Sequence, residues 1–210
     1  MMRAVGSTAS DTTARWNHNI HYHSVLLNRV PVGAATALDV GCGEGTLARQ
    51  LRARVPHVVG IDPDAASIAQ AREQSTDSEI AYVRGDFLDY PFKPESFDVI
   101  TCVATLHHVD LVQGLERFDS LLRVGGVLGI VGLARSSQLR DVPYDLAGIV
   151  GGPVLRRTRP YCEHPSPTVW PPPNTYAEVR DKAERHLPGS SFRRRPLFRY
   201  TLIWRKPQSR

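Results

Sequence analysis

The stretch Ala37-Leu-Asp-Val-Gly-Cys-Gly-Glu-Gly-Thr-Leu-Ala48 decides the fold that this sequence predicts. Its apolar start predicts a short buried strand, and residues 46–54 predict a helix. Gly41, Gly43 and Gly45 stand at alternate positions between the two. Glycine permits a sharp turn and lets a ligand lie against bare main chain, and the N-terminus of a helix favours an anionic group. A strand, a glycine-rich turn and a helix in this order build nucleotide sites in doubly wound sheets.

Strand and helix patterns continue to alternate up to residue 135. This alternation predicts a mostly parallel sheet with helices on both faces. Thr175 and Glu178 form a capping box, which predicts one more helix, and two runs with strand periodicity at the C-terminus predict an antiparallel hairpin. The expected strands are 37–40, 57–61, 80–84, 97–103, 127–134, 190–195 and 198–206, and the expected helices are 46–54, 65–74, 111–122 and 175–187.

The length of 210 residues fits one domain with a substantial core. We expect this single domain over residues 15–210, preceded by a disordered tail, 1–14, of small and polar residues. Within it, residues 15–33 would form a cap segment ahead of the first strand. Eight prolines crowd residues 136–174, and proline lacks the N–H that helices and sheets need. That stretch is therefore predicted to be a long insertion or lid, with at most one short helix near 144–150.

The spacing of the glycines separates two kinds of nucleotide site. The dinucleotide fingerprint is G-x-G-x-x-G, whereas this chain has D-x-G-x-G-x-G over residues 39–45, followed by Thr46 in place of a further glycine. The pattern resembles motif I of the class I S-adenosylmethionine-dependent methyltransferases, in which the loop wraps the amino-acid end of the cofactor. The resemblance implies S-adenosyl-L-methionine as cofactor and a Rossmann-like, doubly wound α/β fold. It also implies a mostly parallel seven-stranded sheet of order 3-2-1-4-5-7-6, closed by the C-terminal antiparallel hairpin.

Acidic residues end or follow the first three expected strands, at the edge where open parallel sheets bind ligands. By the resemblance, Asp39 reaches the cofactor's amino group, Asp62 accepts hydrogen bonds from the ribose hydroxyls, and Asp86 accepts one from the adenine amino group. Asp62 and Asp86 could equally be ordinary cap or turn residues, and Phe87 either contacts the base or belongs to the core. The expected cofactor-binding set is Asp39, Gly41, Cys42, Gly43, Gly45, Asp62, Pro63, Asp86, Phe87, Cys102, Val103 and Ala104.

Two histidines follow the fourth expected strand, next to the position at which the methyl group would be presented. Histidine titrates near neutral pH, which suits a general base. His107 and His108 are therefore the expected catalytic residues, with His107 preferred. One of the two could instead cap the following helix or fill the core.

The segment 16–23 is rich in aromatic and imidazole groups. Trp16, Tyr22 and His23 are expected to bind the substrate, although ordinary helix packing would explain this composition as well. The three histidines of the segment have no nearby cysteine or carboxylate that would complete a metal site. No metal is therefore expected.

The charge distribution bears on the partner. Residues 1–135 carry 12 basic and 15 acidic side chains, whereas residues 136–210 carry 14 basic and 6 acidic ones. This asymmetry indicates either exposed arginines on a hairpin or a surface for an anionic partner. The motif of adenine-N6 methyltransferases is absent after the fourth strand, and Cys102 lacks the Pro-Cys context of cytosine-C5 enzymes. We expect a small-molecule acceptor with an O, N or C nucleophile, and nucleic acid is disfavoured without being excluded.

Three alternatives stay open. The chain could be an RNA or protein methyltransferase that uses the arginines of residues 156–210, a nicotinamide-dependent oxidoreductase, or a non-catalytic family member that keeps the cofactor site. The longest apolar run, near residues 124–134, contains four glycines and is too short for a membrane helix. The N-terminus lacks the apolar centre of a signal peptide, and three dispersed cysteines suit reduced thiols. We expect a cytoplasmic protein with no membrane segment; the oligomeric state does not follow from the sequence.

Overall fold

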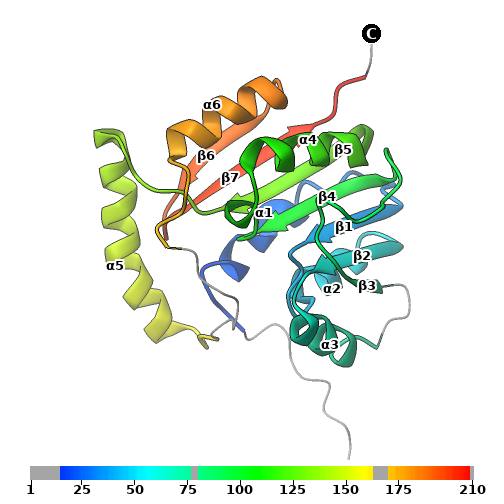
Figure 1. Cartoon of the computed structure of the whole chain (residues 1–210). Coiled ribbons are helices and arrows are strands. Elements are labelled where there is room, and N and C mark those ends of the chain that lie inside the picture. Colours follow the sequence, from blue (N-terminus) through cyan, green and yellow to red (C-terminus); the bar gives the residue numbers. More distant parts are fainter. Residues whose placement is uncertain (1–14, 77–79, 163–169, 209–210) are drawn as a thin grey trace, which may run out of the picture.

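A seven-stranded sheet forms the centre of the protein in the computed structural model (Figure 1). The structure describes residues 15–76, 80–162 and 170–208, so the expected disordered tail, 1–14, lies outside the described residues. The strands are β1 (Thr36–Val40), β2 (His57–Asp62), β3 (Ile80–Arg84), β4 (Phe97–Val103), β5 (Leu122–Gly132), β6 (Ser191–Arg195) and β7 (Arg199–Arg205). Their order is β3-β2-β1-β4-β5-β7-β6. Strands β1 to β5 run parallel, and β7 is antiparallel to both β5 and β6. The predicted fold class, strand order and terminal hairpin are confirmed.

Helices cover both faces of this sheet (Figure 1). The α-helices are α1 (His23–Leu27), α2 (Thr46–Arg52), α3 (Ala65–Glu73), α4 (Leu111–Leu121), α5 (Val142–Thr158) and α6 (Tyr176–His186), and the short 3-10 helices are η1 (Ile20–Tyr22), η2 (Leu106–His108) and η3 (Leu139–Asp141). One buried cluster joins α4 and α6 to the sheet through Phe118 and Ala183. A second cluster joins α1, α2 and α3 to the opposite face through Leu26, Leu51 and Ile68. The strands between these two layers are buried on both sides, as parallel strands require.

Side-chain caps fix where three helices begin. Asp64 accepts a hydrogen bond from the Ser67 N–H at the start of α3 (2.8 Å), and Asp110 accepts from two N–H groups at the start of α4. At α6 the Thr175 hydroxyl accepts from the Glu178 N–H, while the Glu178 carboxylate accepts from the Thr175 N–H. The predicted capping box is therefore confirmed, and it satisfies two donors that the first turn leaves free.

The Pro-rich stretch contains a long helix, so the expectation of at most one short helix near 144–150 was wrong. Helix α5 has 17 residues. Pro143 lies in its first turn, where no N–H is needed, and the other prolines of the stretch except Pro153 follow its end. Pro153 lies inside the helix and removes the donor to the carbonyl of Ile149. Because Ile149 is exposed, water can reach that side of the helix.

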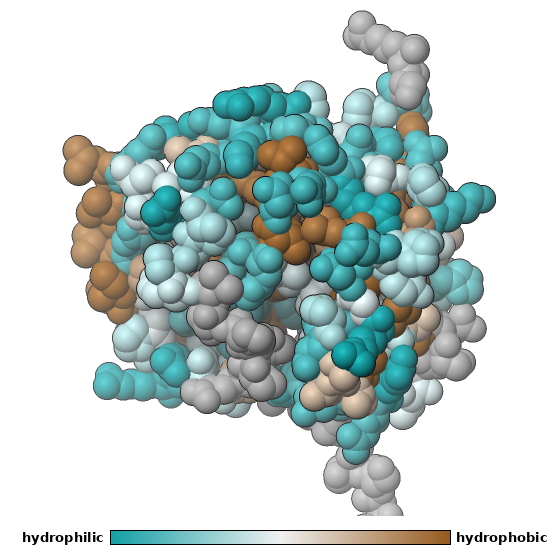
Figure 2. Space-filling view, viewed as in Figure 1, coloured by the Kyte–Doolittle hydropathy of each residue, from teal (hydrophilic) through white to brown (hydrophobic). Residues whose placement is uncertain are grey.

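One face of α5 is apolar and exposed to solvent. Val142, Leu146, Ile149, Val150 and Val154 are between 46% and 67% exposed, and their spacing places them along one side of the helix. Figure 2 shows brown atoms on the flank where Figure 1 places α5. The residues that α5 buries against the rest of the protein are Gly148 and Gly152.

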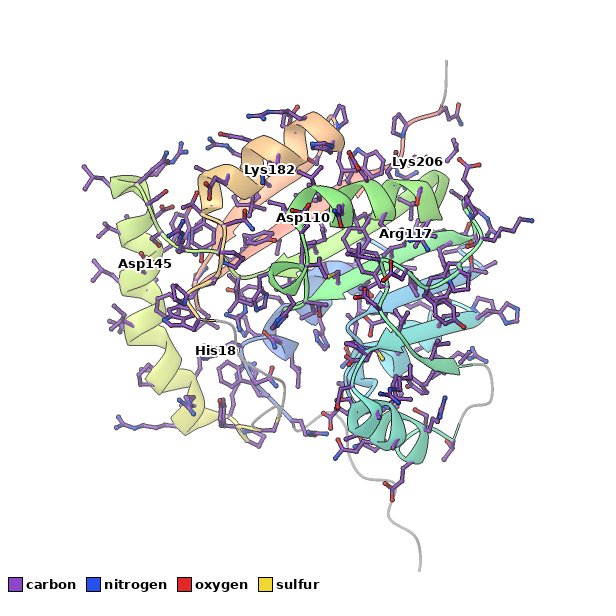
Figure 3. All side chains as sticks on the ribbon, viewed as in Figure 1. His18, Asp110, Arg117, Asp145, Lys182 and Lys206 are labelled. Atoms are coloured by element: carbon purple, nitrogen blue, oxygen red, sulfur yellow. The ribbon has the colours of Figure 1, made fainter. Side chains whose placement is uncertain are left out.

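Arg194 of β6 connects the start of α5 to the sheet. Its Nη2 lies 2.6 Å from Oδ1 of Asp145, which projects from α5 in Figure 3, and its Nε lies 3.8 Å from Oδ1 of Asp141. The guanidinium also lies 3.4 Å from the ring centroid of Tyr176. Since the Arg194 side chain is only 7% exposed, these contacts are shielded from solvent and hold α5 in place.

Strand β5 begins earlier than the sequence predicts. A turn was expected over residues 122–126 and a strand from residue 127, whereas the observed strand already begins at Leu122. The pairing with β4 shifts register between Phe97 and Val99, and Gly125 has a φ of +77°. The glycines thus mark an irregularity inside the strand and not its boundary.

Asp98 joins three segments at the amino ends of the parallel strands. Its Oδ2 accepts hydrogen bonds from the backbone N–H groups of Ala35 and Thr36, each at 2.9 Å, and the guanidinium of Arg123 donates to both of its oxygens at 3.1 Å. Burial acts to raise the pKa of Asp98, but these hydrogen bonds outweigh it and lower the pKa below its usual value. At this edge of the sheet, one carboxylate therefore connects three segments through hydrogen bonds and an ion pair.

In the part of the chain that the structure describes, no helix is long and apolar enough to cross a membrane. Cys42, Cys102 and Cys162 are free thiols.

Candidate active site

The glycine loop follows β1 at the carboxyl edge of the sheet, and its three glycines, Gly41, Gly43 and Gly45, all have positive φ angles. Gly41 and Gly45 have φ angles of +68° and +78°, a region that favours glycine. A Cβ on Gly41 would collide with the side chain of Thr105, and one on Gly45 would collide with the hydroxyl of Tyr82. The Gly41 N–H donates to the carbonyl of Ile61 at 2.8 Å. The loop is thus packed tightly between the ends of its neighbouring strands.

Asp39 is a buried carboxylate behind this loop, with 2% of its surface exposed. Its Oδ1 accepts a hydrogen bond from the Thr101 hydroxyl at 2.7 Å, whereas its Oδ2 has no hydrogen-bond partner within the described residues. Burial raises the pKa of Asp39 to about 7; the Thr101 hydrogen bond opposes this shift and the nearby Asp62 adds to it. A buried acceptor without a donor is costly unless a ligand supplies one.

Two further acids occupy the ends of β2 and β3. The Oδ2 of Asp62 accepts from the Gly43 N–H at 3.0 Å and its Oδ1 from the Asp64 N–H at 2.9 Å, so Asp62 connects the glycine loop to the start of α3. Asp86 is exposed, and its Oδ1 accepts from the Leu88 N–H at 2.9 Å. Both carboxylates keep further lone pairs for a ligand, because each ionised carboxylate offers about four acceptor positions.

A cavity of about 420 Å³ opens between these acids and the residues after β4. It brings together nine of the residues predicted to bind cofactor or to catalyse: Gly41, Asp62, Pro63, Asp86, Phe87, Val103, Ala104, His107 and His108. A neighbouring cavity of about 50 Å³ is lined by Asp39, Cys42 and His23, among others. Gly43, Gly45 and Cys102 line neither cavity. The larger cavity is of the size typical for a small-molecule site.

Residues after β4 form one wall of the large cavity. Ala104 has a φ of +52°, an unusual conformation for a residue with a side chain, of the kind found at functional sites. Its N–H donates to the carbonyl of Val131 at 2.8 Å. Cys102 is buried beneath this wall, and burial raises the pKa of its thiol to about 12. The thiol of Cys102 is therefore protonated at neutral pH and is no nucleophile.

The two predicted catalytic histidines differ in exposure. His107 is 9% exposed, and its Nδ1 has no hydrogen-bond partner among the described residues. Burial is the main cause that lowers the pKa of His107 to about 4, and the charges of His108 and Arg199 contribute to this shift. His108 is exposed; burial of part of its ring lowers its pKa, and Asp62 opposes that shift. The ring centroids lie 4.1 Å apart. His107 is neutral at pH 7, as a proton acceptor must be, but a pKa this low makes it a weak base in the ligand-free protein.

Comparison with known proteins identifies the family. The model of a methyltransferase domain matches residues 38–130. An uncharacterized methyltransferase of Mycobacterium tuberculosis is 35% identical over 193 residues, which cover 91% of this chain and 98% of that protein.

The chain belongs to the class I S-adenosylmethionine-dependent methyltransferases.

Other relatives share part of this methyltransferase or its fold. The 2-phytyl-1,4-naphtoquinone methyltransferase of Thermosynechococcus vestitus is 42% identical over 107 residues, 49% of this chain and 47% of that protein. The solved structure of Haemonchus contortus phosphoethanolamine N-methyltransferase 2, in complex with phosphomonomethylethanolamine and S-adenosylhomocysteine, has a TM-score of 0.63 at 16% identity. The matched region covers 90% of this chain and 53% of the Haemonchus contortus chain. The predicted enzyme class and cofactor are thereby confirmed.

The residues present fit this cofactor. The unpartnered Oδ2 of Asp39 is a buried acceptor for a cationic amino group, and Gly41 lines both cavities, so a ligand there can lie against bare main chain. Asp62 and Asp86, at successive strand ends along the cavity, are acceptors for hydroxyl and amino donors. Phe87 lines the cavity but also stacks on Phe118 of α4, with centroids 4.9 Å apart, so it belongs to the core as well.

The aromatic N-terminal segment packs mainly against protein. Trp16 is 4% exposed and its Nε1 donates to His21, while the Tyr22 hydroxyl donates to the Pro196 carbonyl at 2.8 Å. Neither residue lines one of the two cavities. His23 lies at the smaller cavity and hydrogen-bonds to Gln50. The geometry thus favours packing for Trp16 and Tyr22.

His18 lies between α5 and the sheet (Figure 3), and no three His, Cys, Asp or Glu side chains among residues 15–76, 80–162 and 170–208 could hold a metal ion.

Asn19 and Arg199 are among the cavity residues that sequence reasoning missed. Arg199 is the first residue of β7 and alternates with apolar residues, which predicts an outward side chain. It is only 8% exposed, because the N-terminal segment covers it: Oδ1 of Asn19 accepts two hydrogen bonds from its guanidinium. The sequence carries no local signal for this burial, because Asn19 lies 180 residues from Arg199 along the chain.

Proposed function

We propose that this methyltransferase methylates a small-molecule acceptor in the cavity between Asp62 and His107. The observation that carries the proposal is the cavity itself, which joins the cofactor acids to two neutral histidines in about 420 Å³. Two named groups of relatives support it. Besides the naphthoquinone enzyme, sterol 24-C-methyltransferases match 60% of this chain at about 30% identity, and both names specify small molecules.

Asp39, Asp62 and Asp86 would hold the cofactor by its amino group, ribose and adenine, with the glycine loop against its amino-acid end. When bound, S-adenosylmethionine supplies an electrophilic methyl group on a sulfonium. The protein's task is then to orient the acceptor and to remove its proton. Holding the reacting atoms in line contributes most of the rate in such reactions.

His107 is the residue placed to remove that proton. Its ring lines the cavity, it is neutral at pH 7, and its Nδ1 has no partner in the described structure. A positioned base contributes about 10²- to 10⁴-fold to a proton-transfer step. His108, which is exposed and lies beside His107, is the alternative base.

The proposal is tested by incubating the purified protein and S-adenosylmethionine with a cell extract that ultrafiltration has divided into a small-molecule filtrate and a retained fraction of RNA and protein. The release of S-adenosylhomocysteine is measured with each fraction separately. Product formation in the small-molecule filtrate supports it. Product formation only with the retained RNA and protein would refute it, and would instead favour the basic C-terminal part as a binding surface.

With an acceptor found, His107→Ala should reduce kcat by about a hundredfold or more and leave S-adenosylhomocysteine affinity unchanged. His57→Ala, the same substitution at the other edge of the sheet, is the matched control. Full turnover of the His107 variant would exclude it as the base.

A further inference from the structure

Arg199 places a positive charge in the wall of the large cavity. The residue is 8% exposed, and it lines that cavity together with Asn19, His107 and Leu133. A buried guanidinium normally has a carboxylate partner, because desolvating an unpaired charge is costly. The surroundings of Arg199 are therefore informative about what binds there.

All hydrogen-bond partners of Arg199 within the described residues are neutral. Its Nε and Nη2 donate to Oδ1 of Asn19 at 3.1 and 2.8 Å. Its Nη1 donates to the carbonyls of Leu197 at 3.2 Å and Phe198 at 3.4 Å. These four contacts leave one of the five N–H groups of the side chain without an assigned acceptor, and they leave the charge without a counterion.

Two carboxylates on elements that pack near β7 are paired with a different arginine. Asp141 and Asp145, on η3 and α5, contact Arg194 of the neighbouring strand. Burial lowers the pKa of Arg199 to about 10, and Tyr176 and Tyr22 oppose this shift. Arg199 nevertheless remains charged at pH 7.

The charges of the cavity are separated into two halves. Asp62, Asp64 and Asp86 lie at the ends of β2 and β3, where the cofactor is expected. Arg199 lies on the other side, close enough to His107 for its charge to lower that residue's pKa. An acceptor that enters this second half meets cationic and neutral groups only.

We propose that Arg199 binds an anionic oxygen group, a carboxylate or a phosphate, of the methyl acceptor. Its free N–H and its charge would complete the ion pair that the protein leaves open, and Asn19, whose Oδ1 faces Arg199, retains its Nδ2 as a second donor. The substrate class is then small organic anions. This inference rests on the proposed small-molecule function and makes Arg199 a substrate-binding residue for it.

The competing explanation is structural. Arg199 also connects Asn19 of the N-terminal segment to the turn before β7, in which Leu197 and Phe198 have φ angles of +59° and +58°. That role needs donors but no charge. Arg199→Gln retains donors and removes the charge, whereas Arg199→Lys retains the charge. Arg157→Gln, on the exposed end of α5 outside the cavity, is the matched control.

The experiment is calorimetry on protein saturated with S-adenosylhomocysteine. The probes are hexanoate against hexanamide, benzoate against benzamide, and phenyl phosphate against phenol. We expect the acid of at least one pair to bind about tenfold more tightly than its neutral partner, as a charged hydrogen bond predicts. This preference should persist in Arg157→Gln, decrease in Arg199→Lys and vanish in Arg199→Gln. A carboxylate preference and a phosphate preference identify the two sources of the anion separately.

Equal binding of acid and neutral partner in every pair, or no binding of any acid, would overturn the proposal. So would a preference that survives Arg199→Gln. S-adenosylhomocysteine affinity, measured first in each variant, shows whether the variant is folded. If neutral small molecules are methylated while the acids do not bind, this inference fails alone; if only macromolecules are methylated, the proposed function fails.

Discussion

Cofactor affinity should depend on pH through Asp39. Its carboxyl is 2% exposed, and burial raises its pKa to about 7 in the ligand-free protein. A cationic amino group beside the free Oδ2 favours the ionised form, because opposite charges attract strongly in a buried site. Affinity for S-adenosylhomocysteine should therefore fall as the pH falls through 7, where Asp39 gains a proton.

The size of the effect follows from the ionised fraction. With a pKa of about 7, this fraction is about one tenth at pH 6 and about nine tenths at pH 8, so the dissociation constant should be about tenfold larger at pH 6. The effect on stability has the opposite sign. Because the folded pKa lies above the ordinary value of 3.8, ionisation costs stability as the pH rises toward 7.

Calorimetry with two ligands at pH 6, 7 and 8 measures this dependence. S-adenosylhomocysteine carries the amino group, whereas 5′-methylthioadenosine lacks the amino-acid end and should bind with little pH dependence. Asp39→Asn should bind S-adenosylhomocysteine more weakly at pH 8 and without the pH dependence. Thr101→Val removes the hydrogen bond that favours the ionised form, so its midpoint should move to higher pH. An affinity equal at pH 6 and pH 8 in the natural protein, or an unchanged slope in Asp39→Asn, would refute the reasoning.

Two further predictions concern the loop and α5. Gly45→Ala should cost about 3 kcal/mol of unfolding free energy and weaken S-adenosylhomocysteine binding, since its Cβ meets the Tyr82 hydroxyl. Gly33→Ala, with a similar φ of +82° but open space, should cost only about 1 kcal/mol; equal costs in urea unfolding would show that the collision is relieved. Arg194→Ala should cost about 3 kcal/mol by leaving its buried partners unpaired and should speed proteolysis within α5, whereas exposed Arg193→Ala should do neither. Unchanged cleavage would mean that other contacts hold the helix.

The fold was predictable because its signals are local. The strand–glycine–helix pattern at residues 37–48 sets the position of β1, and the Thr175 capping box sets the start of α6. Acids at strand ends could be placed at one edge, since parallel strands share their direction. Asp62 and Asp86 accordingly line one cavity.

The parts that could not be predicted depend on tertiary context. The number of prolines suggested a loop where α5 forms. The helix forms nevertheless, because Pro143 is tolerated in the first turn and Pro153 removes a hydrogen bond only on an exposed side of the helix. Arg199 looked like a surface residue by strand alternation, but it is buried against Asn19, 180 residues earlier in the chain. Periodicity within one segment does not contain that information.

The carboxylate of Asp98 sits at the end of the sheet away from the cavity, where it ties Ala35, Thr36 and Arg123 together. None of these residues lines either cavity. The contacts of Asp98 and the candidate active site thus lie at opposite edges of the same sheet. We expect that substitutions among the cavity residues can change the acceptor preference without affecting the Asp98 contacts. Substitutions that stabilise the Asp98 edge should likewise raise the thermal stability without changing turnover.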